Sequence, residues 1–306
     1  MPIYDQETSE RDRHLAASRA ALRRRQEIRR RRAVAILAIL AALIGLTALG
    51  SGGTSAVAPR LVRGSISETS PFGFALLRAR ETAAIPQILS YTPYISQGTP
   101  YRREVALTFD DGPGPYTGQV VRTLLQERAP GTFFVVGDQV ATFHQTLLDV
   151  VRAGFPIGDH TFSHPYLSQL SPADQRAELD RQAQAIASYG VPSPTLFRPP
   201  YGSFDHQTLD VLRQKGMLMV LWTVDTEDYR QPGVAAIAQT ALAGARPGAI
   251  ILMHDAGGDR SQTVSAIPQI VRGLRQRGFR LVTVPRLILD DPPPRDQPLP
   301  DQLAGG

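Results

Sequence analysis

Between residues 101 and 289, short apolar runs alternate with longer stretches in which apolar residues recur at helical spacing. The apolar runs predict buried strands at 105–109, 132–136, 218–224, 249–253 and 279–284. The stretches between them predict helices at 118–128, 145–153, 172–189 and 264–277. Alternation of apolar strands with helices indicates an α/β fold with a parallel sheet covered on its outside, open or closed into a barrel.

Local signals support two of the predicted helices. In the first, Val121, Leu124 and Leu125 are spaced to share one helix face. The third is preceded by Ser171, a favourable N-cap residue, and opens with Pro172, which suits the first position of a helix. In such α/β folds the chemistry collects at the carboxyl ends of the strands, so the residues that follow each predicted strand are the candidates for a site.

The amino-terminal part of the chain has the pattern of a membrane anchor. Arginines at 23–25 and 29–32 run directly into an uncharged apolar stretch at 33–50. About 18 apolar residues is the lower limit for a helix that spans a bilayer. The flanking arginines predict that residues 1–32 form a basic cytoplasmic tail and that the remainder lies outside the cytoplasm.

Two other interpretations of this segment are open. Ala56-Val-Ala58 has the small-x-small form of a signal-peptidase site, so the domain would be secreted after cleavage near Ala58. However, Pro59 follows it, and 32 residues form a long leader for a signal peptide. A buried core helix would leave the arginines unexplained. We expect an uncleaved single-pass anchor, and cleavage would also place the domain outside.

The regions that flank the alternating pattern are poorer in packing signals. Residues 51–100 begin with Ser-Gly-Gly-Thr-Ser and read as a stalk and approach segment. Residues 290–306 are rich in proline and predict a disordered tail. The catalytic domain is therefore expected at 101–289.

The charge of the chain is unevenly distributed. The chain has 306 residues, 42% of them hydrophobic and 20% charged, with a formal net charge of +5. Residues 1–32 hold ten arginines against five acidic residues, so they alone account for this net charge. A surface that binds nucleic acid would keep a basic excess without the tail, so we expect no nucleic-acid partner. The absence of cysteine excludes disulfides, thiolate zinc ligands and cysteine nucleophiles.

Two motifs offer metal ligands. Thr108-Phe-Asp-Asp-Gly-Pro113 places the adjacent carboxylates of Asp110 and Asp111 at a strand end, where their repulsion is costly unless a cation holds at least one of them. His160 and His164 are four residues apart, so on a helical turn their imidazoles would share a face. Two histidines and one carboxylate form a facial ligand set that leaves positions open for water and substrate.

Three further motifs lie at or after apolar runs. Arg198-Pro-Pro-Tyr201 carries prolines that hold the arginine and the Tyr201 amide in a rigid turn. The segment from Trp222 to Tyr229 contains three acidic residues, the last of which is Asp228. His254 ends a very hydrophobic run, and a strand-end histidine near carboxylates suits proton transfer at neutral pH.

Together these five segments resemble the polysaccharide deacetylase family, the metal-dependent carbohydrate esterases that include chitin and peptidoglycan deacetylases. The resemblance covers roughly residues 101–285 and rests on Thr-Phe-Asp-Asp-Gly-Pro, His-Thr-x-x-His, Arg-Pro-Pro-Tyr, Asp-x-x-Asp-Tyr and Leu-x-His. It implies an irregular (β/α) barrel, which agrees with the strand–helix alternation and would here be preceded by one transmembrane helix.

The resemblance also implies roles for the motif residues. Asp111, His160 and His164 would bind the metal ion. Asp110 would be the general base for a water molecule at the metal, and Arg198 would pair with Asp110 and orient it.

The remaining implied roles concern the leaving group and the substrate. His254 would be the general acid that protonates the leaving amine, tuned by Asp228. The backbone amide of Tyr201, beside Pro199 in the substrate-binding turn, would stabilise the oxyanion together with the metal. Leu252 would line the acetyl pocket.

Tyr229 is the one clear departure from the family pattern. The family usually has tryptophan at this place after the second aspartate of the fourth motif, and this residue would also line the acetyl pocket. Tyrosine retains an aromatic wall and adds a hydroxyl, so the shape of the pocket is in question but the chemistry is not.

The combined pattern predicts an N-deacetylase for a peptidoglycan or chitin-like glycan outside the cytoplasm. It would use one divalent metal ion, zinc by preference, although cobalt, nickel or manganese suit the same ligands. The alternatives are a same-site amide hydrolase for a lipid-linked or small-molecule substrate and a non-catalytic glycan-binding protein. We expect a glycan substrate and the membrane as partners, and the sequence indicates no obligate protein partner.

Overall fold

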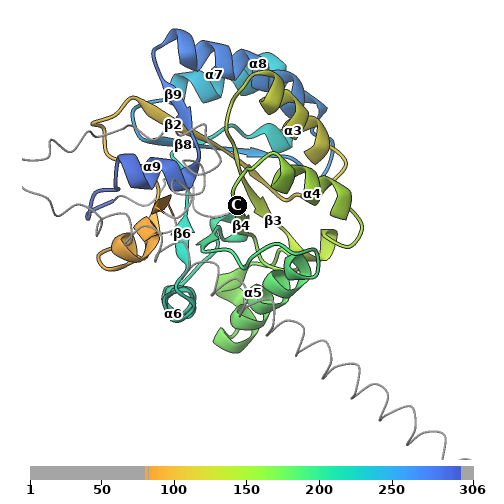
Figure 1. The fold of residues 1–306 in the computed structure, drawn as a ribbon, viewed down its shortest axis with the longest axis vertical. Coiled ribbons are helices and arrows are strands. Elements are labelled where there is room, and N and C mark those ends of the chain that lie inside the picture. Colours follow the sequence, from red (N-terminus) through yellow and green to blue (C-terminus); the bar gives the residue numbers. More distant parts are fainter. Residues whose placement is uncertain (1–79, 82, 298–306) are drawn as a thin grey trace, which may run out of the picture. The chain divides into compact units, whose positions relative to one another are not determined.

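The computed structural model describes residues 80–81 and 83–297 (Figure 1). The predicted cytoplasmic tail, the anchor at 33–50, the site near Ala58 and the last residues of the tail lie outside the described residues. Within the described part, no helix has both the length and the apolar character needed to cross a membrane.

The described residues form one parallel sheet of nine strands. Its main path runs in the order β1-β6-β5-β4-β3-β2-β8-β7, and β9 pairs with the first half of β2. The strands are β1 Tyr94–Ile95, β2 Glu104–Asp110, β3 Thr132–Val135, β4 Ile157–Asp159, β5 Leu196–Phe197, β6 Leu218–Val220, β7 Val224–Asp225, β8 Ala249–His254 and β9 Arg280–Val282.

The sheet is curled rather than flat. Gln97, shortly after β1 at one end of the path, forms an isolated antiparallel bridge with Ala249 of β8 near the other end. The curl brings the carboxyl ends of the strands around a common centre, where the candidate residues follow β2, β4, β5, β7 and β8. The prediction of an α/β fold with a parallel sheet is therefore confirmed, and the expected irregular (β/α) barrel is present as a curled half-barrel.

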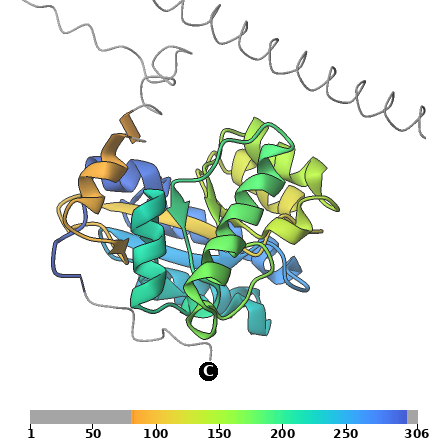
Figure 2. The ribbon, with the colours of Figure 1, turned by 90° about the horizontal axis from the view of Figure 1, so that it is seen from below.

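Helices cover the sheet on its outer side (Figure 1). Helices α7 and α8 pack against each other, α7 against β7 and α8 against β9. Helices α5 and α6 lie side by side (Figure 2), joined by an ion pair between Asp180 and Lys215. The helices are α3 Thr117–Gln126, α4 His144–Arg152, α5 Pro172–Ala187, α6 His206–Lys215, α7 Val234–Gly244, α8 Ser261–Gln276 and α9 Val284–Asp290, with 3₁₀ turns at Gly137–Gln139, Leu167–Gln169, Pro200–Gly202 and Asp228–Arg230.

The alternation of side chains along β2 separates the core from the site. Val105, Leu107 and Phe109 pack with the outer helices in one apolar cluster. Ala106, between them, belongs to a second cluster on the inner face. Because side chains alternate between the two faces of a strand, Asp110 falls on the inner face at the carboxyl end.

Several sequence-based predictions hold at the level of single elements. The predicted strands at 105–109, 132–136 and 249–253 match β2, β3 and β8. The Ser171 hydroxyl accepts a hydrogen bond from the amide of Asp174 and so caps α5 as expected. In α3, however, Leu125 is 52% exposed, because the buried face contains Val120, Val121 and Leu124 instead.

The apolar run at 218–224 was expected to form one strand, and this prediction is wrong. The Leu221 amide donates to the Ile95 carbonyl beside β6, whereas the Thr223 amide donates to the Ile250 carbonyl of β8. The run therefore changes partners within two residues. The carbonyls of Val220 and Leu221 instead accept hydrogen bonds from the Arg198 guanidinium, which satisfies backbone groups that the break leaves buried.

The predicted limits of the catalytic domain are too narrow. Ile85, Ile88 and Ile95 of the approach segment are buried in the inner core cluster. The prediction of an unpacked tail is wrong for residues 291–297, because the amide of Ser96 donates to the Gln297 side chain and the hydroxyls of Tyr91 and Tyr94 donate to tail carbonyls. The tail packs because it meets aromatic and polar groups from a segment far away in sequence.

Candidate active site

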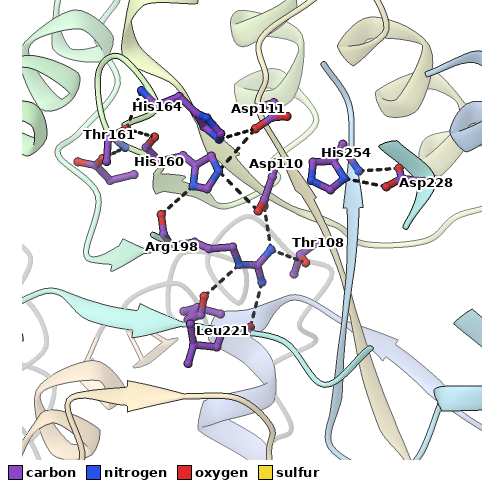
Figure 3. Close-up of polar contacts among 12 residues, drawn as sticks. Thr108, Asp110, Asp111, His160, Thr161, His164, Arg198, Leu221, Asp228 and His254 are labelled. Carbon is purple, nitrogen blue, oxygen red and sulfur yellow. Dashed lines mark hydrogen bonds and ion pairs between the residues drawn. The ribbon is translucent and has the colours of Figure 1, made fainter. Parts of the chain in front are cut away.

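Asp110 and His254 lie side by side because β2 and β8 are paired in register. Asp110 is directly opposite His254, and each is the last residue of a strand whose other positions are buried. His254 lies on one side of Asp110, while His160 and His164 lie on the other (Figure 3). The two predicted proton carriers and the predicted metal ligands therefore meet at one place.

The two adjacent aspartates have different environments. Asp110 ends β2 in extended backbone, but Asp111 has a positive φ of 74°, which departs from the strand conformation. Asp110 pairs with Arg198, and Asp111 faces His160 and His164 (Figure 3). This backbone turn separates two carboxylates that would otherwise repel each other.

Asp111, His160 and His164 form a group that can hold a metal ion. Their ligand atoms all lie within 4.8 Å of one another. The Asp111 carboxylate is 3.6 Å from Nε2 of His160 and 3.1 Å from Nε2 of His164. Burial raises the pKa of Asp111, but the two histidines outweigh this effect and hold the pKa well below its usual value.

The histidines come from a loop and not from the helical turn that their spacing predicted. His160 follows β4, and both Thr161 and His164 have a positive φ, 66° and 57°. The carboxylate of Asp159 accepts from the Thr161 amide, and Thr161 Oγ1 accepts from the His164 amide. Hydrogen bonds within the loop therefore hold a backbone that a helix could not provide.

The chemistry of the donor set fits a divalent metal. Nδ1 of His160 lies 2.7 Å from the Arg198 carbonyl, a contact that places the proton on Nδ1 and leaves Nε2 free as a ligand. Within the described residues, the Oδ1 atom of Asp111 is buried without a hydrogen-bond partner. A buried carboxylate oxygen beside two available imidazole nitrogens is the environment that a zinc-like ion requires.

Arg198 is fully buried and is directed at Asp110. Its Nη1 donates to the Asp110 carboxylate and to Thr108 Oγ1, both at 2.8 Å (Figure 3). Two further donors of the guanidinium reach the carbonyls of Val220 and Leu221. Burial lowers the pKa of Arg198, an effect that the charge of Asp110 partly opposes. The ion pair predicted between Arg198 and Asp110 is thus present, with backbone carbonyls fixing the arginine.

His254 is paired with Asp228 as predicted. Nδ1 of His254 lies 2.7 Å from one oxygen of Asp228, while the other oxygen accepts from the His254 amide and from the Thr263 hydroxyl. Burial by itself lowers the pKa of His254, but the charge and hydrogen bond of Asp228 outweigh it and raise the pKa to about 9. A pKa of about 9 keeps the imidazole protonated at neutral pH.

The predicted substrate-binding residues surround this group. Tyr201 has a positive φ of 58° in the turn that follows Pro199, and its ring meets the His164 ring edge-on at 4.6 Å. The Tyr229 ring meets His254 edge-on at 5.4 Å. Leu252 is buried on the inner face of β8.

Several residues of the site were missed by the sequence analysis. Thr108 and Thr263 fix Arg198 and Asp228. Thr108 stands in the first motif but was assigned no role, and Thr263 lies outside all five motifs. Asp255 is fully buried next to His254, accepts from the Thr117 hydroxyl, and has its pKa raised to about 7, mainly by burial. Its carboxylate occupies the space that a side chain at Gly112 would need, which explains the glycine after the aspartate pair.

Comparisons with known proteins agree with this geometry. The family model described as polysaccharide deacetylase matches residues 97–220. The chain is 38% identical over 205 residues to a peptidoglycan-N-acetylglucosamine deacetylase of Bacillus cereus, covering 65% of this chain and 95% of the relative. It is also 38% identical over 198 residues to a chitooligosaccharide deacetylase of Bradyrhizobium, covering 60% of this chain and 90% of the relative.

A solved structure shows the same likeness. The family 4 carbohydrate esterase from Streptomyces lividans, in complex with acetate, superposes with a TM-score of 0.55 and 34% identity, covering 60% of this chain and 94% of the esterase. These relatives are matched over nearly their whole length, and the residues matched by the family model include Asp110, Asp111, His160, His164 and Arg198. The chain belongs to the polysaccharide deacetylase family and is a hydrolase of the polysaccharide N-deacetylase class.

Proposed function

We propose that the chain removes acetyl groups from N-acetylglucosamine residues of peptidoglycan, outside the cytoplasm and with one divalent metal ion, zinc by preference. The observation that carries this proposal is the convergence of one base, one acid and one metal-ligand group. Asp110, His254 and the Asp111–His160–His164 group meet at the carboxyl ends of the paired strands β2 and β8 and of the nearby strand β4.

The metal group and Asp110 serve the attack on the amide. A divalent ion held by Asp111, His160 and His164 would polarise the acetyl carbonyl and lower the pKa of a water molecule. Asp110 is placed to accept the proton of that water, because its carboxylate lies 3.7 Å from Nε2 of His160. Arg198 keeps Asp110 in one orientation through a buried ion pair.

His254 serves the departure of the amine. Amide cleavage leaves a nitrogen that must be protonated, and a histidine that holds its proton at neutral pH is a suitable donor. Asp228 lies against Nδ1 and so leaves Nε2 of His254 available to face the substrate. Leu252 and Tyr229 are assigned to the acetyl pocket, and the Tyr201 amide to stabilisation of the oxyanion.

The choice of substrate rests on the relatives and on the predicted topology. The similar proteins from Bacillus cereus and Bradyrhizobium are named for peptidoglycan and for chitooligosaccharide. An anchor at 33–50 with arginines before it would hold the domain at the outer face of the cytoplasmic membrane, where peptidoglycan is the accessible polymer. The test for location is separation of membranes from medium, followed by protease treatment of intact and lysed cells.

Acetate release is the direct test of function. The purified full-length chain would be incubated with peptidoglycan and with N-acetylglucosamine oligomers, with chelator and then with zinc, cobalt, nickel or manganese. We expect acetate release that chelator abolishes and zinc restores. Asp110→Asn should lose the activity, while the matched control Asp210→Asn, at an exposed aspartate paired with Arg213, should keep it.

Other outcomes of this experiment would change the conclusion. Zinc binding with no acetate from any glycan, but turnover of a lipid-linked N-acyl sugar, would move the substrate to the membrane. Glycan binding that persists with no turnover of any amide would identify a non-catalytic protein.

A further inference from the structure

Tyr166 is an exposed aromatic residue that the proposed mechanism does not use. It lies two residues after His164, in the loop that supplies two of the metal ligands. Its ring stacks on the ring of Tyr201, with centroids 4.0 Å apart and an angle of 13° between the planes. The two tyrosines come from different loops, one after β4 and the other after β5.

This stack lies at the surface and next to the metal ligands. Tyr166 is 38% exposed and Tyr201 is 41% exposed, so the pair is not part of the apolar core. Tyr201 contacts His164 through the edge-on ring contact described above. The rings of His164, Tyr201 and Tyr166 thus form a continuous row that leads away from the metal ligands.

A further exposed aromatic ring lies on the other side of the site. Tyr229, also 41% exposed, contacts His254 through an edge-on ring contact. His254 and the metal-binding histidines lie on opposite sides of Asp110 (Figure 3). Exposed aromatic rings therefore lie on both sides of the reacting groups, and the side of Tyr166 has one ring more.

Exposed tyrosines in this arrangement suit one kind of ligand. A tyrosine ring offers a flat apolar face, and its hydroxyl can donate or accept a hydrogen bond. The face of a pyranose ring presents C–H groups, while its edge presents hydroxyls. A sugar ring can therefore stack on the tyrosine and bond to its hydroxyl at the same time.

We propose that Tyr166, supported by Tyr201, binds a sugar ring of the glycan that neighbours the acetylated sugar at the metal. This inference rests on the proposed function, since it takes the metal ligands as the place of the reacting acetyl group. Tyr166 then contributes to the affinity for long chains and contributes little to the affinity for short ones. Because Tyr166 lies in the same loop as His160 and His164, one segment would bind both the metal ion and the neighbouring sugar.

The test compares binding of short and long substrates. Affinities of the full-length Asp110→Asn chain for the di-, tetra- and hexasaccharides of N-acetylglucosamine would be measured by titration calorimetry in the presence of zinc. Adding Tyr166→Ala should weaken hexasaccharide binding roughly 3- to 10-fold relative to disaccharide binding, the loss expected for one aromatic contact. Tyr166→Phe retains the ring face and should restore most of this preference.

Tyr101→Ala is the matched control, because Tyr101 is 87% exposed and precedes β2 at the opposite end of the strands. Equal losses of affinity for all three oligosaccharides, together with a lowered melting temperature, would assign Tyr166 to loop packing and overturn the inference. Unchanged affinity at every length, or no binding of the hexasaccharide, would also overturn it. Length-dependent binding without acetate release by the unmodified chain would overturn the proposed function and leave this inference standing.

Discussion

The two ends of the parallel sheet use charged residues in opposite ways. At the carboxyl end, charged groups are buried and pair with one another, as Arg198 does with Asp110 and His254 with Asp228. At the amino end, Glu104 is also buried, but its partner Arg280 is half-exposed, and other arginines are exposed and donate to backbone carbonyls. The guanidinium of Arg275, for example, bonds to the carbonyls of Glu127 and Arg128, just after α3.

The arginines of the amino end act as caps for helices. Helices leave their last carbonyls without partners, and cations near these carbonyls interact favourably with the helix dipole. Arg277 likewise donates to the carbonyls of Leu242 and Ala245 at the end of α7. Because these groups remain in water, each contact contributes little to stability.

The difference shows where charge serves function. A buried charge is costly to desolvate, and a partner has to compensate for it, so buried pairs mark a place where a particular ionisation or orientation is required. Exposed arginines at helix ends carry no such cost. Substitutions at the carboxyl end should therefore have larger effects than substitutions at the amino end.

The largest effect is expected for Asp110→Asn. Removal of a general base typically lowers the rate about 10²- to 10⁴-fold, and asparagine retains the shape needed to accept from Arg198. We expect the specific rate of acetate release to fall by this factor while zinc binding persists. A variant with more than one tenth of the original rate would show that another group accepts the proton.

Arg198→Met should mainly affect stability. The variant leaves the Asp110 carboxylate buried without its partner, and breaking a buried ion pair costs about 3–5 kcal/mol. We expect the free energy of unfolding in denaturant titrations to fall by this amount. Arg213→Met, at an exposed pair on α6, should cost less than about 1 kcal/mol. Similar costs for the two variants would remove the distinction between buried and exposed charge.

Asp228→Asn should change the pH dependence of the reaction. The pKa of His254 is raised to about 9, so the acid form persists below this pH and activity declines as the pH rises through it. Loss of the Asp228 charge should lower this pKa by about 1–3 units and move the alkaline limb of the rate profile to lower pH. Rates measured from pH 5 to pH 11 at constant zinc would show the shift.

The same pair also links stability to pH. Because the folded pKa of His254 lies above the ordinary value of 6.5, its contribution to stability is fully present below pH 6.5 and is lost as the pH rises through about 9. Asp228→Asn should flatten this dependence. An alkaline limb and a stability curve that stay unchanged in the variant would separate Asp228 from the titration of His254.

Arg275→Ala should have the smallest effect. It removes two hydrogen bonds at the end of α3, but the freed carbonyls can bond to water, so the cost should be below about 1 kcal/mol. Acetate release should be unchanged. The free energy of unfolding would be measured by thermal or denaturant titration. A drop of more than about 3 kcal/mol in this free energy would mean that the amino end is as sensitive to charge as the carboxyl end.

Much of the carboxyl end follows from the sequence, because alternation along a strand is a local property. The apolar pattern predicts β2 and β8 as buried strands that end at Asp110 and His254. Their pairing in register then places the two side chains next to each other. The spacing of His160 and His164 identifies them as a pair, but the helical turn expected for them is absent. Their loop is set by hydrogen bonds to Asp159 and Thr161, which outweigh the local spacing.

Contacts between segments far apart in the sequence determine features of the fold that no local pattern predicts. The run at 218–224 is apolar throughout, yet it divides between β6 and β7, because its strand partners lie far away in sequence and Arg198 donates hydrogen bonds to its unpaired carbonyls. The packing of residues 291–297, the contact of Thr263 with Asp228 and the stack of Tyr166 on Tyr201 have the same origin.

The sequence by itself determined the class of fold, the strands β2, β3 and β8 and the motif residues that meet at the carboxyl end of the sheet. Periodicity and motif spacing record these features within a few neighbouring positions. Only the tertiary structure decided which residues support the site and which surface surrounds it. Those contacts join segments tens of residues apart, and the curl of the sheet that brings them together leaves no trace in any one segment.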